Sequence, residues 1–254
     1  IPAALNGVTG FKPTQARVPR TGALPLSFSL DTIGPLARTV QDCAQADAVL
    51  AGQPWAPLHE RSPRGVRIGV PRGLLLTQTD AAVLQAFETA LTALKASQAD
   101  VQDVALDHWL AAPFSLQEAG TLIAAEAAHI HADLLAAGYG AQLDPQVLSR
   151  IQRGQTIAAP HYVGVQQMRA LLQRELDAQL ADWDLLALPT VAVVAPTIES
   201  LADEALFQRT NMLVLRNTSV FNFYDLPAVS LPLPCPDGQM PVGLMLVGKR
   251  GADH

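Results

Sequence analysis

The sequence has 254 residues, of which 49% are hydrophobic and 16% charged, a composition that supports a large core and excludes a mostly disordered chain. The chain has a net charge of -6 and no run of Lys or Arg residues, which argues against nucleic acid or an anionic membrane as partners. No apolar run reaches the roughly 18 residues that a membrane-spanning helix needs. With only Cys43 and Cys235, no disulfide framework or cysteine metal site is expected, so a cytoplasmic location is predicted.

The first third of the chain is predicted to open with an ordered loop layer, rich in Gly and Pro, that runs to about Leu30. A helix is expected to begin at Pro35, where proline's missing N–H costs nothing, and to stop at Gly52. Several prolines over residues 53–65 indicate a surface connection. The alternation of residues 66–70 then predicts a strand.

Helices and strands alternate over the rest of the chain. A helix is predicted over residues 80–97 with Asp80 as its cap, followed by a strand over 101–106. Ser115 and Glu118 have the spacing of a capping box and predict an Ala-rich helix that runs to about Ala137. Two more helices are expected at about 145–153 and 160–182, and strands over 185–190, 228–233 and 242–247. This order predicts an α/β fold in a single domain, residues 1–254.

The opening residues are expected beside the central sheet. Apolar runs and short connections place residues 1–11 next to the late strands over 228–233 and 242–247. This is a long-range pairing between the two ends of the chain.

The titratable residues do not form a recognisable catalytic or metal motif. His129 and His131 are two residues apart and point to different helix faces, which excludes a two-histidine metal clamp. His131 is interpreted as a packed or half-exposed ring, and Glu126 as a buried structural or a solvated carboxylate. Lys12 sits between a tight turn and Pro13 and is assigned a structural role, with a role as general base as the alternative. Neither a Gly-x-Ser-x-Gly elbow nor a Ser-x-x-Lys motif is present, so no catalytic residue is assigned within the chain and no metal or cofactor is expected.

Short motifs of a known enzyme family are spread along the chain, from the first residues to the late strands. They are Ile1-Pro2-Ala3, Gly10-Phe11-Lys12-Pro13-Thr14, Ser29-Leu30-Asp31, Arg150-Ile151, Gly154, Tyr162, Gln166-Gln167, Arg169, Leu188-Pro189-Thr190, Asn217-Thr218, Phe221-Asn222 and Leu226-Pro227-Ala228. Together they resemble the motifs of the amidase signature family of serine amidohydrolases. The sequence departs from the family pattern at Ala16 and Asp225, where the family often has glycine.

The resemblance implies a fold and a chemistry. It implies a mixed central sheet covered by helices on both faces, and hydrolysis of a non-peptide carboxylic amide through a serine acyl-enzyme. It also implies that the nucleophilic serine, a second serine in a cis peptide and a lysine lie upstream of Ile1, and that a closing helix follows His254. The chain as written is therefore expected to be inactive alone. The alternatives are the glutaminase subunit of a tRNA-dependent amidotransferase and a non-catalytic fragment.

Four residues are candidates for substrate binding. Arg150 matches a position that contacts the substrate carboxylate in the amidotransferase branch of the family, and a guanidinium can hold such a group bidentately. Thr218 and Asn222 match positions near the family's acyl pocket, and Arg216 is a second candidate anion clamp. A structural ion pair for the arginines and loop capping for Thr218 and Asn222 stay open as alternatives. The expected partner is a small-molecule amide, with a homodimer left open.

Overall fold

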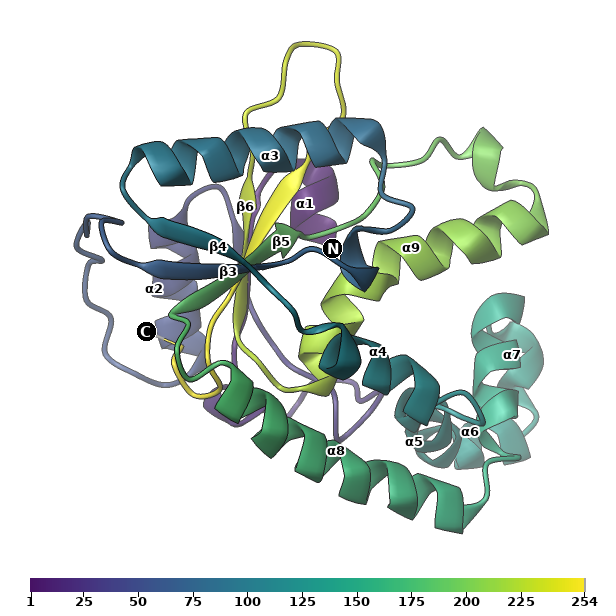
Figure 1. Ribbon diagram of the computed structural model, residues 1–254. Coiled ribbons are helices and arrows are strands. Elements are labelled where there is room, and N and C mark those ends of the chain that lie inside the picture. The colour runs from purple at the N-terminus through teal and green to yellow at the C-terminus, as the bar shows by residue number, and fades with distance from the viewer. Residues whose placement is uncertain (254) are drawn as a thin grey trace.

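The computed structural model describes residues 1–253 and arranges its strands in one seven-stranded sheet of order β2-β1-β6-β7-β5-β3-β4 (Figure 1). One half of the sheet is parallel, since β3 pairs in parallel with both β4 and β5, and the other half is antiparallel. The predicted mixed sheet is therefore confirmed. The strands are β1 (Thr9–Lys12), β2 (Leu36–Ala37), β3 (Arg67–Pro71), β4 (Asp100–Val104), β5 (Leu185–Pro189), β6 (Ala228–Pro232) and β7 (Gly243–Val247).

Helix α3 (Ala81–Ala96) covers one face of the parallel half (Figure 1). Its buried residues Val83, Phe87 and Leu91 recur every four positions and make a single apolar stripe. Phe87 and Leu91 pack in a cluster that includes Ile68 of β3. This helix is the crossover between the parallel strands β3 and β4.

The opposite face of the sheet is covered by α8 (Ala159–Gln179), together with α4 (Asp107–Leu116) and α9 (Glu204–Phe223). Strand β5 shows how side chains divide between the two faces. Leu186 and Leu188 join the cluster that holds Leu176 of α8, whereas Ala187 between them joins the cluster of α3. Helices therefore cover both faces, as predicted.

The opening residues lie beside the late strands, as predicted, but only part of the segment is extended. Strand β1 pairs with β6, and Gly10 lies opposite Ser230. Residues before it form a short helix, α1 (Pro2–Asn6), which packs on β1, β6 and β7. Proline at the first helical position and Gly7 in the left-handed conformation, with φ of 65°, favour this single turn and its stop.

A helix is present where one was predicted from Pro35, but it begins later than predicted. Residues 36–37 are strand β2, and the Pro35 carbonyl accepts a hydrogen bond from Phe11 N at 3.0 Å. Helix α2 (Val40–Leu50) begins after Thr39, whose Oγ1 accepts from Asp42 N. Pairing with β1 therefore outweighs the local preference for a proline-led helix start.

The predicted capping box at Ser115 was also wrong, because Ser115 lies inside α4. Helix α4 contains Pro113, which cannot donate to the Trp109 carbonyl four residues earlier. The hydroxyl of Tyr224 donates to that carbonyl instead, at 2.5 Å. The next helix is capped by Thr121, and the predicted Ala-rich helix is two helices, α5 (Leu122–Ile130) and α6 (Ala132–Ala136).

Two further helices complete the fold. Helix α7 (Pro145–Gly154) matches the prediction closely and starts at Asp144, whose carboxylate accepts from Gln146 N and Val147 N. Helix α9 spans 20 residues and was not predicted. Within residues 1–253, no helix combines the length and apolar character needed to cross a membrane.

Candidate functional site

The carboxyl ends of the parallel strands meet at one edge of the sheet, where open α/β sheets commonly bind ligands. The short helix η2 (Leu74–Leu76) follows β3 there, and residues 190–194 follow β5. Asp80 joins the two connections, because its backbone N–H donates to the Ala192 carbonyl at 2.9 Å and its carboxylate accepts from Val194 N at 3.0 Å. The predicted side-chain cap of Asp80 on α3 is not made, since the carboxylate is used in this way.

Three buried polar side chains, those of Thr190, Asn217 and Ser230, lie at the same edge. The hydroxyls of Thr190 and Ser230 are 2.7 Å apart, and the side-chain amide of Asn217 donates to the Pro189 carbonyl at 2.8 Å. A Cβ added to Gly243 would lie 2.6 Å from Ala4 Cβ and 2.9 Å from Thr190 Oγ1. Helix α1 therefore sits directly on these strand ends, and Figure 1 shows the chain start between the tip of β5 and α9.

Arg216 anchors α9 to this edge. Its Nη1 donates to the Thr77 carbonyl at 2.5 Å, its Nη2 to the Leu75 carbonyl at 2.7 Å, and its Nε to Asn217 Oδ1 at 3.0 Å. Burial lowers the pKa of Arg216. In this conformation the guanidinium is used by protein acceptors, and its role as a clamp for a substrate anion stays a prediction.

The other three candidates lie on two helices. Thr218 and Asn222 are part-buried residues of α9 rather than loop residues, and Thr218 Oγ1 donates to the Leu215 carbonyl at 3.2 Å. Arg150 is exposed on α7. Helix α7 reaches the start of α9 through the amide of Gln146, which lies 2.9 Å from both carboxylate oxygens of Glu204. The structure thus gathers three of the four candidates on α9.

Two cavities lie elsewhere on the surface, and neither is lined by the four candidates. A cavity of about 310 Å³ is formed within the segment 20–33, with Arg20, Phe28 and Asp31 among its walls. A cavity of about 130 Å³ lies near Phe11 and Pro227. Over residues 1–253, no three His, Cys, Asp or Glu side chains come together in a way that could hold a metal ion.

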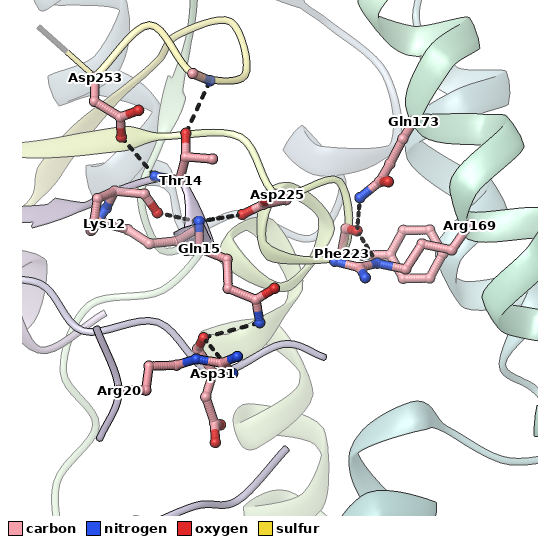
Figure 2. Close-up of polar contacts among 12 residues, drawn as sticks. Lys12, Thr14, Gln15, Arg20, Asp31, Arg169, Gln173, Phe223, Asp225 and Asp253 are labelled. Carbon is pink, nitrogen blue, oxygen red and sulfur yellow. Dashed lines mark hydrogen bonds and ion pairs between the residues drawn. The ribbon is translucent and has the colours of Figure 1, made fainter. Parts of the chain in front are cut away.

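Lys12 and Asp225 join the start of the chain to the end of α9 (Figure 2). Lys12 Nζ donates to the Pro13 carbonyl at 2.8 Å and lies 3.9 Å from Asp225 Oδ1, and burial lowers the pKa of Lys12 to about 8. Asp225 has φ of 57°, a conformation that favours glycine, and its carboxylate also accepts from Gln15 N at 2.8 Å. These contacts compensate for the strained backbone where the sequence departs from the family glycine.

The lowered pKa of the partly buried Lys12 leads us to expect that stability depends on pH. Its pKa is about 8 in the folded protein against 10.5 for an ordinary lysine, so between these values the folded protein binds fewer protons than the unfolded chain. The free energy of unfolding should therefore rise from pH 8 to pH 10.5 more steeply in the wild type than in Lys12→Met. Urea unfolding across this range measures it, with Lys95→Met at an exposed position as the control. Parallel profiles for wild type and Lys12→Met would contradict the prediction.

Glu126 is the buried carboxylate that the sequence left undecided. It is 1% exposed, and it accepts from Ser27 Oγ at 2.5 Å, Ser29 N at 3.0 Å and Tyr162 OH at 2.8 Å. Ser29 Oγ and Gln166 Nε2 also donate to it. The only sequence signal was the pair Tyr162 and Gln166, which are four residues apart on one helix face, because the serines lie almost 100 positions away.

Comparisons with known proteins agree with this fold. The family model described as Amidase matches residues 1–254. The 2-amino-5-chloromuconic acid deaminase of Comamonas testosteroni is 34% identical over 261 residues, which cover 100% of this chain and 55% of the relative. A glutamyl-tRNA(Gln) amidotransferase subunit from Roseiflexus castenholzii is 32% identical over 283 residues, covering 98% of this chain and 56% of the relative.

Solved structures give the same picture. A crystal structure of an amidase superposes with a TM-score of 0.83 at 32% identity, covering 100% of this chain and 57% of that one. A glutamyl-tRNA(Gln) amidotransferase subunit from Thermotoga maritima superposes with a TM-score of 0.73 at 26% identity, covering 99% of this chain and 56% of that one. The chain thus spans little more than half the length of the relatives it matches.

Proposed function

Because this chain belongs to the amidase family, we propose that the protein hydrolyses a small carboxylic amide through an acyl-enzyme on a serine. The observation that supports this most is the match over all 254 residues, together with a TM-score of 0.83 to a solved amidase at 32% identity. A serine hydroxyl becomes a useful nucleophile only when a base removes its proton, and a lysine can do so when it is kept neutral. Both groups are proposed to lie upstream of Ile1.

Residues 1–254 are proposed to supply the substrate side of the site. The resemblance implies a serine upstream of Ile1, and Ile1 leads directly into α1, which packs on the strand ends beside Thr190. The acyl carbonyl must come within about 3–3.5 Å of the serine hydroxyl, so groups from several segments must converge there. Thr218 and Asn222 on α9 are proposed to orient the amide, and Arg150 and Arg216 to bind a substrate carboxylate.

The direct test is ammonia release from a panel of simple amides by the full-length protein. Hydroxylamine added to the same reactions should capture the acyl group as a hydroxamate, which reports the acyl-enzyme. Residues 1–254 expressed alone are the matched control and should release no ammonia above the buffer blank. Failure of the full-length protein on every amide would contradict the proposal.

A glutaminase subunit is the second candidate, because the amidotransferase subunit of R. castenholzii is 32% identical over 98% of this chain. That activity requires glutamine as the amide and partner subunits that use the ammonia. Ammonia transfer to a glutamylated tRNA in the presence of partner subunits would favour it. Hydrolysis of non-glutamine amides by the protein alone favours the stand-alone amidase.

If Arg150 and Arg216 bind a substrate carboxylate, the enzyme should prefer acidic substrates to neutral ones. In the full-length enzyme, Arg150→Ala should raise the barrier for an acidic substrate by about 1–3 kcal/mol and spare a neutral one, because only the acidic substrate loses a charge-assisted hydrogen bond. Arg216→Ala should show the same selectivity if its guanidinium also binds substrate. Comparing kcat/KM on the two substrates measures both. Equal losses on both substrates would assign Arg216 to its contacts with Leu75 and Thr77.

A further inference from the structure

Helix α8 carries a stripe of polar residues that other elements use as contacts. Tyr162, Gln166, Arg169 and Gln173 follow one another at spacings of four, three and four, so they share one face of the helix. This face is not a solvated one. Its first two members hydrogen-bond the buried Glu126, and its last two reach the end of α9.

The beginning of the stripe is fixed by Glu126. The side chains of Tyr162 and Gln166 lie 2.8 Å and 3.3 Å from Glu126 Oε1. Ser27 and Ser29 donate to the same carboxylate from the loop before β2. A carboxylate buried this deeply is stable only while it is fully hydrogen-bonded, so α5, α8 and the loop are held in one arrangement.

The end of the stripe caps α9. Arg169 Nε donates to the Phe223 carbonyl at 2.6 Å, its guanidinium carbon lies 5.7 Å from the centre of the Phe223 ring, and Gln173 Nε2 is 3.5 Å from the same carbonyl (Figure 2). Phe223 is the last residue of α9, where carbonyls have no partner within the helix. A cation at this position also interacts favourably with the helix dipole.

The cap at Phe223 matters for the proposed site because Asn222 and Asp225 lie close to it in the chain. Asn222 is a candidate substrate residue, and Asp225 is held in its left-handed conformation by Gln15 N. We propose that Arg169 is a positioning residue: it fixes the end of α9, and hence Asn222, while Glu126 fixes the helix that carries Arg169. The kinetic part of this proposal rests on the amidase function proposed above, and the structural part does not.

Hydrogen exchange measured by mass spectrometry tests the structural part. In Arg169→Gln, amides of residues 217–226 should exchange roughly tenfold faster, the effect expected from losing one charge-assisted hydrogen bond, while residues 81–96 of α3 exchange as in the wild type. Glu126→Gln should accelerate exchange in 27–31 and in 217–226. Arg174→Gln, an exposed change on the same helix, is the matched control. Unchanged exchange at 217–226, or an equal rise throughout the molecule, would overturn the proposal.

Kinetics of the full-length enzyme test the second part. Arg169→Gln should lower kcat/KM for an amide about tenfold, and Arg169→Lys should recover part of it because it retains the charge. If Arg169→Gln does not fold, Arg169→Lys decides, with faster exchange at 217–226 supporting the role and wild-type exchange overturning it. Wild-type kcat/KM in a variant with a loosened α9 end would refute the positioning role. An inactive wild type would refute the proposed function alone, because the exchange result stands without it.

Discussion

Replacing Asp47 by alanine is expected to destabilise the protein by about 3–5 kcal/mol, because it breaks an ion pair that is largely shielded from water. Arg17, at the end of η1 (Gln15–Arg17), donates through Nε to Asp47 Oδ2 of α2 at 2.8 Å. The two side chains are only 9% and 5% exposed, so water can replace little of the lost interaction. The pair joins the first turn after β1 to the helix beyond β2.

Urea unfolding of Asp47→Ala measures this effect. Glu88→Ala is the control, because Glu88 also pairs with an arginine, Arg72, but the two side chains are 51% and 35% exposed. Exposed pairs of this kind contribute about 0–1 kcal/mol. A loss in Asp47→Ala no larger than that in Glu88→Ala would show that burial does not make the Arg17 pair important.

Gly154→Ala is expected to cost about 1–3 kcal/mol or more, because helices α5 and α7 touch at this glycine. A Cβ on Gly154 would lie 1.8 Å from the Ala124 carbonyl oxygen and 2.8 Å from Ala128 Cβ, so the helices must move apart. Moving α7 away from α5 would also displace Arg150, which lies one turn earlier on α7. The change therefore disturbs both the fold and a proposed substrate residue.

The matched control is Gly164→Ala in α8. A Cβ there meets nothing within 4 Å, so the usual gain of roughly 0.5–1 kcal/mol from replacing a helical glycine should appear. The two variants make the same chemical change in two helices and should shift the melting temperature in opposite directions. Shifts of the same sign would mean that helix propensity, not the α5–α7 contact, controls position 154.

Regular patterns in the sequence predicted most of the elements, and tertiary contacts explain the rest. Helix α3 and strand β5 followed from hydrophobic spacing alone, within a few residues. Helix α9 did not, because one of its most buried residues is Asn217, whose amide is satisfied by the Pro189 carbonyl of another element. Strand β2 was missed because its pairing with β1 is not visible in the local sequence.

The candidate site, like the fold, was predicted from the sequence only in part. Family motifs pointed to Arg150, Thr218 and Asn222, and Arg216 was added as a second candidate anion clamp. The sequence carries no distances, so it could not show that the Arg216 guanidinium donates to the carbonyls of Thr77 and Leu75. In the sequence, Glu126 is one acidic residue in an Ala-rich helix, and only the helical pair Tyr162 and Gln166 hints at its partners. Its donors come from segments about 36 and 100 positions away, a convergence that only the folded chain creates.

The pairing of β1 with β6 sets an order of events during synthesis. Strand β1 lies between β2 and β6, so one of its edges stays open until residues 228–232 have been made. At about 5–20 residues per second, the ribosome needs roughly 10–40 s to reach them after β1 emerges. During this time β1 has a free edge that other strands could occupy. Pairing with β6 thus covers this edge of β1 and ends the period in which the edge is open to mispairing.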